Sequence, residues 1–209
     1  MREVDFASLL CSRLCHDLLS PVGALNNGIE LLADEHDPEM RARCLELLAE
    51  SARVSANKLK FFRLAFGAAG GFGDTVDSRE AKAAIEGLLG GERILLGWIV
   101  AEPALGKNAL KILLNLALIA ADALVRGGRL DIGAEGGEIV VRAEGPRLVL
   151  DPELRTALLG QTNPAALTPR AAAAWLVHQL AAEIGGSIQV SEPEEGVLLF
   201  GAMLPADRV

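Results

Sequence analysis

Aromatic side chains are scarce in this chain of 209 residues, which has six phenylalanines, two tryptophans and no tyrosine. The core must therefore be built mainly from leucine, alanine, valine and isoleucine, and a hydrophobic share of 51 % suffices for that. No uninterrupted apolar run reaches the ~18 residues that a membrane-spanning helix needs. The first residues lack the pattern of a secretory signal. We therefore expect a cytoplasmic protein that does not associate with membranes.

Basic residues and cysteines are also few. The formal net charge is −8, with 20 lysines and arginines against 28 acidic residues, which argues against a nucleic-acid partner. Three cysteines without a CxxC pair indicate reduced thiols. Cys11 and Cys15 stand near His16, but they share an apolar face from which His16 points away. We expect no bound metal.

The first third of the chain predicts two long helices. Apolar residues between Asp5 and Ala33 repeat at alternating spacings of four and three, which is a heptad stripe. The stripe comprises Cys11, Cys15, Leu18, Val22, Leu25, Ile29 and Leu32. A second helix is predicted from Pro38, capped by Asp37, to about Phe66. Because such a hairpin has a poor core alone, we expect two copies to pair into a dimeric four-helix bundle.

The pattern changes after a glycine-rich linker at 67–74, which follows a helix and so does not resemble a phosphate-binding loop. We place the domain boundary there, giving a helical hairpin at 1–73 and a second domain at 74–209. The second domain is predicted to contain a buried strand at 93–100, a helix at 104–125, a β-hairpin turning at Gly136–Gly137, a helix at 169–186 and two strands in 187–204. The fold class is therefore α+β, with the hairpin followed by a two-layer α/β sandwich.

His16 is the main candidate for chemistry. At 100° per residue, His16 lies about 140° from the centre of the apolar stripe, in the outward sector with Arg13, Ser20, Gly23 and Asn27. This position disfavours a histidine satisfied in the core, although a solvated histidine without a role stays open. Within the same predicted helix, Pro21 cannot donate a hydrogen bond to the carbonyl of Asp17, and it is expected to bend the helix just past His16.

The stretch "HDLLSPVGA" resembles the phosphoacceptor box of bacterial sensor histidine kinases, which His16, Asp17, Leu18, Ser20 and Pro21 match. The second domain resembles the kinase ATP-binding domain with its nucleotide ligands replaced. Asn115 matches the first asparagine of the kinase Asn box, whereas Ile119 stands at the Mg²⁺-binding asparagine. Further replacements are Ala143 for the adenine-reading aspartate, Arg147 for a glycine of the same box, and Ala171–Ala174 for the phosphate loop. Together these changes argue against ATP binding.

A kinase-like hairpin followed by a degenerate ATPase-like domain resembles the bacterial histidine phosphotransferases of the ChpT type. The resemblance implies a homodimer that takes a phosphoryl group from the receiver domain of a hybrid histidine kinase. It would pass that group to receivers of response regulators, including a DNA-binding cell-cycle regulator. No cofactor would be bound by this chain, and Mg²⁺ would be supplied by the partner receiver.

The resemblance also implies roles for single residues. His16 would be the phosphoacceptor, Asp17 an orienting acid, and Ser20 a residue of the transfer face. A receiver would dock on the face that carries Arg13, Gly23 and Asn27, although an ordinary solvated charge is an equal alternative for Arg13. His36 lies in the predicted turn between the two helices and is expected to be solvated. His178 lies in the last predicted helix and is expected to be either structural or exposed.

Two other functions stay open from the sequence. One is an ATP-dependent histidine kinase with divergent nucleotide boxes. The other is a regulatory dimer in which His16 has no catalytic role.

Overall fold

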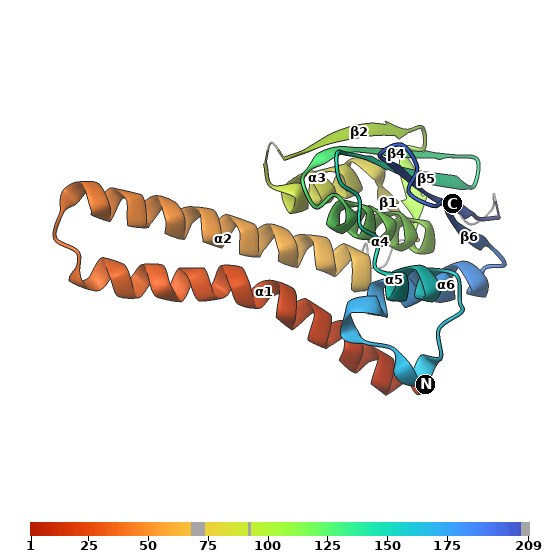
Figure 1. The fold of residues 1–209 in the computed structure, drawn as a ribbon, viewed down its shortest axis with the longest axis horizontal. Coiled ribbons are helices and arrows are strands. Elements are labelled where there is room, and N and C mark those ends of the chain that lie inside the picture. Colours follow the sequence, from red (N-terminus) through yellow and green to blue (C-terminus); the bar gives the residue numbers. More distant parts are fainter. Residues whose placement is uncertain (68–73, 92, 206–209) are drawn as a thin grey trace.

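The computed structural model describes residues 1–67, 74–91 and 93–205, and it begins with two long antiparallel helices (Figure 1). Helix α1 spans Glu3–Asp34 and helix α2 spans Pro38–Phe66. The predicted start of α2 is confirmed, because the Asp37 carboxylate accepts a hydrogen bond from the Glu39 backbone N–H at 3.1 Å. The hairpin projects from the remainder of the chain, and α1 bends away from α2 toward its N-terminus.

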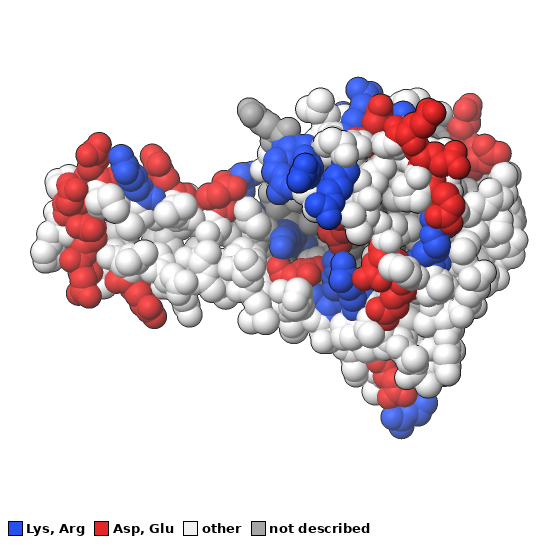
Figure 2. All heavy atoms as spheres, in the orientation of Figure 1, with Lys and Arg blue, Asp and Glu red and all other residues white. Residues whose placement is uncertain are grey.

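The apolar stripe of α1 is partly packed against the rest of the chain and partly exposed. Pro21 and Gly28 are buried, and Gly28 lies against α2, where a Cβ atom added to it would approach the Leu48 side chain to 2.8 Å. Leu18, Leu25 and Leu32 share this face and are half-buried, whereas four members of the predicted seam stay exposed: Cys11, Cys15, Val22 and Ile29. Figure 2 shows few charged side chains along the middle of the hairpin. No helix among the described residues is long and apolar enough to cross a bilayer.

The second part of the chain alternates strands and helices. Its strands are β1 (Thr75–Asp77), β2 (Ile94–Val100), β3 (Ala104–Gly106), β4 (Gly128–Glu135), β5 (Glu138–Glu144), β6 (Ser187–Val190) and β7 (Val197–Met203). Its α-helices are α3 (Ser78–Leu89), α4 (Lys107–Ala123), α5 (Pro152–Leu158) and α6 (Ala172–Glu183), and 3₁₀ turns occupy η1 (Pro164–Ala166) and η2 (Pro169–Ala171).

Five strands form the main sheet in the order β2-β4-β5-β7-β6, with β2 parallel to β4 and the other pairs antiparallel. Strands β1 and β3 form a separate antiparallel pair. The helices lie on one side of the main sheet, which gives the predicted two-layer arrangement (Figure 1). The predicted turn between β4 and β5 is confirmed, since Gly136 and Gly137 have φ of 57° and 96°, values that favour glycine.

Three predicted elements differ from the structure. The segment 93–100 was expected to be buried, but β2 is an edge strand whose Leu95 and Ile99 face solvent on the uncovered side of the sheet. The helix expected from residue 104 begins at Lys107, because Ala104–Gly106 pair with β1. The helix expected from residue 169 begins with the 3₁₀ turn η2 and becomes α-helical at Ala172.

The two parts of the chain share one core. Phe61, Phe62, Leu64 and Ala65 in the last turns of α2 belong to the same buried cluster as the helices and strands that follow. Helix α2 ends at Phe66, and most of the predicted linker at 67–74 lies outside the described residues. The end of α2 therefore anchors the hairpin to the sheet domain through apolar packing.

Candidate functional site

His16 is presented to solvent on α1, as the helical wheel predicts. Its side chain is 83 % exposed. Ser20 and Asn27 are exposed on the same helix, and nothing lies within 4 Å of a Cβ atom built at Gly23. The histidine therefore stands on a helix face of small and polar side chains that another protein surface can approach.

The carboxylate of Asp17 holds the imidazole. His16 Nδ1 and Asp17 Oδ1 are 3.2 Å apart. An ionised carboxylate only accepts hydrogen bonds, so the ring donates through Nδ1–H and leaves the lone pair on Nε2. A contact of the kind expected for an orienting Asp17 is therefore present, and it leaves Nε2 of an exposed ring available for reaction.

Arg13 is not the solvated charge that one alternative from the sequence describes. Its side chain is only 12 % exposed. Nε donates to Asp17 Oδ2 at 2.7 Å, one terminal nitrogen contacts Asp122 Oδ2 at 3.0 Å, and the other donates to the Arg170 carbonyl at 3.3 Å. The guanidinium therefore joins α1 to the end of α4 and to η2, and its electrostatic partners lie within this chain.

Pro21 frees a backbone carbonyl that a second helix then satisfies. A residue other than proline at position 21 would donate its N–H to the carbonyl of Asp17. Here Lys58 Nζ on α2 donates to that carbonyl oxygen at 2.8 Å. The ammonium thus ties α2 to α1 one residue after His16, and the bend of α1 is stabilised by a charge-assisted hydrogen bond.

Replacing Lys58 by methionine should lower the free energy of unfolding by about 1–2 kcal/mol, because the carbonyl of Asp17 loses its donor. In a Pro21→Ala background the same replacement should have a smaller effect, since the alanine N–H can donate to this oxygen. Urea unfolding of the four proteins of this double-mutant cycle measures the coupling. Additive effects of the two substitutions would contradict the assignment.

A cleft of about 570 Å³ lies beside His16, between α1 and the second domain. Its lining residues come from α1, α4 and the segment around η2: Ser12, Arg13, His16, Asp17, Asp122, Thr168, Pro169 and Arg170. Arg170 contacts Asp151 Oδ2 at 3.2 Å, and its side chain is mostly exposed. Asp122 and Arg170 are absent from the residues proposed from sequence, because only the fold brings them to α1, more than 100 positions away.

Asp122 carries an electrostatic penalty. Partial loss of hydration beside the surrounding protein raises the pKa of Asp122 above its ordinary value of 3.8, although the side chain is 53 % exposed. Repulsion by Asp17 adds to this effect, while Arg13 and Arg170 oppose it. The folded protein therefore holds this proton more tightly than the unfolded chain. Stability that Asp122 contributes at low pH is lost as the pH rises through its raised pKa.

The Asp122→Asn variant lacks this titration. We expect the free energy of unfolding of the wild type to fall relative to that of the variant as the pH rises from below 3.8 through the raised pKa. Urea unfolding at several pH values between about 3 and 7 measures the difference. A difference that does not change with pH, or that favours the wild type as the pH rises, would show that the charge of Asp122 is not disfavoured by folding.

All but one of the residues named above at the positions of the kinase nucleotide boxes are packed into the core; the exception is Arg147. Ile119, Ala143 and Ala171–Ala174 are buried; Ala171 ends η2, and Ala172–Ala174 begin α6. Asn115 is fully buried, and its Nδ2 donates to the carbonyls of Ala65 at 3.1 Å and Lys111 at 2.8 Å. Asn115 therefore connects α4 to the end of α2. Arg147, by contrast, is exposed and follows β5.

The remaining histidines and the cysteines are not among the residues that line this cleft. His36 is exposed in the turn between α1 and α2, and the His178 ring lies 5.5 Å from that of Trp175 in a tilted arrangement. A Cβ atom at Gly160 would collide with the His178 ring, so this histidine packs closely on the chain. Cys11 and Cys15 are exposed and Cys44 is buried. The described residues contain no group of three or more metal-binding side chains.

Comparison with known proteins places the chain in a family. Residues 78–196 match the family model described as histidine phosphotransferase C-terminal domain. The chain is 41 % identical over 136 residues to protein phosphotransferase ChpT of Brucella abortus (strain 2308). The aligned segment covers 65 % of this chain and 64 % of that protein. The alignment thus spans less than two thirds of the Brucella protein.

Solved structures extend the similarity to the whole chain. A bacterial phosphotransferase has a TM-score of 0.85 at 32 % identity, with 97 % of each chain covered. The Acinetobacter baumannii histidine kinase AdeS is more distant, with 13 % identity, a TM-score of 0.46, and 92 % of this chain and 98 % of the other covered. The family model matches more than half of this chain, so the chain belongs to the histidine phosphotransferases defined by that C-terminal domain.

Proposed function

We propose that the protein is a phosphorelay histidine phosphotransferase that accepts a phosphoryl group on His16 from the aspartyl phosphate of a receiver domain. The observation that carries this proposal is the geometry of His16, whose ring is 83 % exposed while Asp17 engages Nδ1. The similarity to a protein phosphotransferase and to a solved bacterial phosphotransferase supports the same reaction class.

In the forward step, the Nε2 lone pair attacks the phosphorus and a P–N bond forms. The P–O bond to the receiver aspartate breaks, and the aspartate leaves as a carboxylate. The Nδ1 proton stays on the ring, where Asp17 stabilises the positive charge that the imidazole acquires. The reverse set of changes delivers the group to the aspartate of a second receiver. Phosphoryl transfer needs mainly alignment and charge neutralisation, and an exposed, oriented ring supplies the alignment.

ATP is not expected to be the phosphoryl donor. Ile119 offers no oxygen to Mg²⁺, and Ala143 offers no carboxylate to an adenine amine. Both side chains are buried in the packed core, as are Ala171–Ala174. A nucleotide bound as in the kinases would therefore need ligands that this chain does not carry and space that its core occupies. The chain would bind no cofactor, and the partner receiver would bring the Mg²⁺.

The resemblance to the histidine phosphotransferases implies the partners. A receiver domain of a hybrid histidine kinase would be the donor, and response-regulator receivers, including that of a DNA-binding cell-cycle regulator, would be acceptors in the cytoplasm. Receiver docking would use the face of α1 that carries His16, Ser20, Gly23 and Asn27, together with the neighbouring cleft. Arg13, which is mostly buried and lines the cleft, would contribute to this surface.

A homodimer is part of the proposal. Both helices of the hairpin expose large apolar side chains, which a second hairpin would cover in a four-helix bundle. These side chains include Leu19, Val22, Ile29 and Leu31 on α1 and Leu45, Leu47 and Leu59 on α2.

A labelling experiment with two arms tests the function. One arm supplies radiolabelled ATP and Mg²⁺ alone, and the other adds a receiver domain that already carries labelled phosphate. The proposal expects acid-labile label on the protein only in the second arm. Label from ATP alone would identify a histidine kinase. Label in neither arm, with receivers from several hybrid kinases, would favour a regulatory dimer.

A further inference from the structure

The charge network beneath His16 crosses the boundary between the hairpin and the sheet domain. Arg13 and Asp17 lie on α1, whereas Asp122 lies at the end of α4, and the three side chains are joined by contacts of 2.7 and 3.0 Å. Arg13 uses separate nitrogens of its planar guanidinium for Asp17, for Asp122 and for the backbone carbonyl at η2. A lysine ammonium cannot reproduce this fork, because it is a single point charge.

The two oxygens of Asp17 have different partners. Oδ2 accepts from Arg13, and Oδ1 faces His16 Nδ1 at 3.2 Å. Because Arg13 occupies one oxygen, rotation of the carboxylate is restricted and the other oxygen is held against the imidazole. The orientation of the imidazole therefore depends on where Arg13 sits, and Asp122 helps to fix that place from the second domain.

We propose that Arg13 and Asp122 are positioning residues that hold Asp17 against His16, so that the sheet domain sets the ring tautomer used for phosphoryl transfer. The inference rests on the proposed function and adds to it a task for a domain that lacks nucleotide ligands. Asp122 contacts Arg13 at 3.0 Å although folding raises its pKa, which is consistent with a role other than stability.

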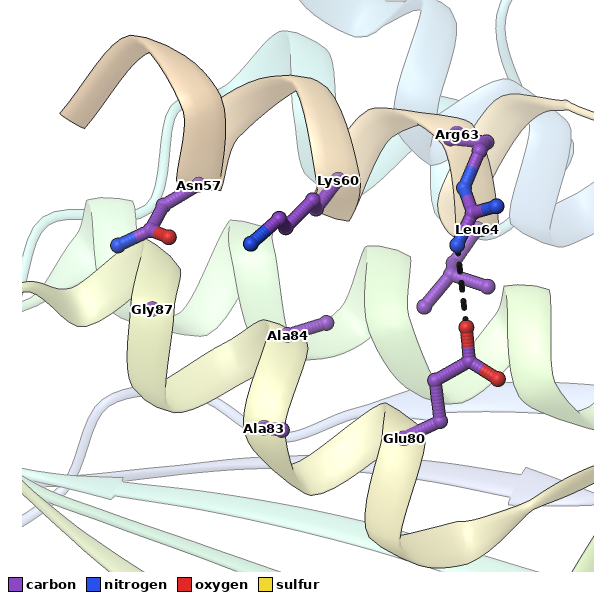
Figure 3. Close-up of a pocket in the computed structure, with 8 residues that line it drawn as sticks. All are labelled: Asn57, Lys60, Arg63, Leu64, Glu80, Ala83, Ala84 and Gly87. Carbon is purple, nitrogen blue, oxygen red and sulfur yellow. Dashed lines mark hydrogen bonds and ion pairs between the residues drawn. The ribbon is translucent and has the colours of Figure 1, made fainter. Parts of the chain in front are cut away.

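A second ion pair between the same two parts provides a matched control. Arg63 on α2 and Glu80 on α3 are 3.1 Å apart and line a groove of about 170 Å³ that does not include His16 (Figure 3). Figure 3 shows both side chains reaching across from facing helices, beside Asn57, Lys60 and the small residues of α3. Removing this pair tests the effect of losing an interdomain salt bridge without touching the network of Asp17.

The experiment compares the full-length wild type with Arg13→Lys, Arg13→Gln, Asp122→Asn and the control Glu80→Gln. The ¹⁵N chemical shifts of histidine-labelled protein report the tautomer of His16 without any receiver. The wild type and Glu80→Gln should hold the Nδ1–H form, whereas both Arg13 variants and Asp122→Asn should show a mixture of tautomers. Circular dichroism and thermal unfolding verify that each variant is folded, and Asp122→Asn keeps the size and shape of the native side chain.

Single-turnover transfer from a phosphorylated receiver provides the second readout. The rate should fall by about tenfold in Arg13→Gln and severalfold in Asp122→Asn and Arg13→Lys, and stay unchanged in Glu80→Gln. Wild-type tautomer and rate in folded Arg13→Gln and Asp122→Asn would overturn the inference and leave the proposed function intact. A wild type that accepts no phosphate would overturn the proposed function, while the ¹⁵N shifts would still decide whether Arg13 and Asp122 fix the ring.

Discussion

Replacing His16 by glutamine should lower the rate of phosphoryl acceptance from a phosphorylated receiver by about 10³-fold or more, since the nucleophile itself is removed. The glutamine amide nitrogen has no free lone pair, although the side chain retains polarity and similar reach. The fold should be preserved, because the histidine side chain is 83 % exposed. Single-turnover labelling with a phosphorylated receiver measures the rate, and thermal unfolding verifies the fold.

His36→Gln is the matched control for this variant. His36 is exposed in the turn between α1 and α2, so the same chemical change is made on the same hairpin away from Asp17. Label should accumulate on His36→Gln as on the wild type. Acid-labile label on His16→Gln at the wild-type rate would move the phosphoacceptor to another histidine, and equal losses in both variants would indicate a general effect on the hairpin.

Lysines placed at both Val22 and Ile29 should raise the dissociation constant of the proposed homodimer by about 100-fold or more, because like charges would meet in the interface. The two side chains lie one heptad apart on α1 and are 47 % and 59 % exposed in the single chain, so the lysines should be tolerated within a folded monomer. In a four-helix bundle the same positions would be buried, where an unpaired ammonium is strongly disfavoured. Sedimentation equilibrium over a range of protein concentrations measures the association.

The control places lysines at Leu95 and Ile99, which are exposed on the uncovered face of β2. This variant carries the same added charge on another apolar surface and should remain dimeric. A Val22→Lys, Ile29→Lys protein that stays dimeric would show that another surface joins the copies. Dissociation of both variants would point to the added net charge rather than to the position on the hairpin.

The parts of the fold with strong local signals were predictable from the sequence. The α2 start follows from Asp37 and Pro38, and the turn at Gly136–Gly137 follows from residues that accept positive φ. Residues 75–89 carry no predicted element, yet they form β1 and α3. The buried face of α3 carries Ala81, Ala84 and Ile85 at helical spacing, and Asp77 caps the helix, so α3 has a local signal that the sequence prediction did not use.

Some features of the candidate site were also predictable from local sequence, and others were not. The exposure of His16 follows from its position on a single helix, and the carbonyl freed by Pro21 follows from the missing N–H. Lys58 as its donor and Asp122 as the partner of Arg13 depend on the packing of α1 against α2 and against α4. The apolar stripe of α1 also does not show which of its residues pack against the same chain and which stay exposed. These features are set by tertiary structure, so a local pattern does not contain them.

The packed alanines and Ile119 also bear on how the ATPase-like domain can change over evolutionary time. Restoring an asparagine at position 119 would place an amide in a site where the present side chain is 3 % exposed. Restoring a carboxylate at position 143 would bury a charge in a fully enclosed strand. Each reversion would destabilise the fold before a nucleotide could bind and compensate for it. This packing therefore opposes the substitutions that a nucleotide site would need. Under the proposed function, sequence changes should alter the proposed preference among receivers more readily than they create a kinase.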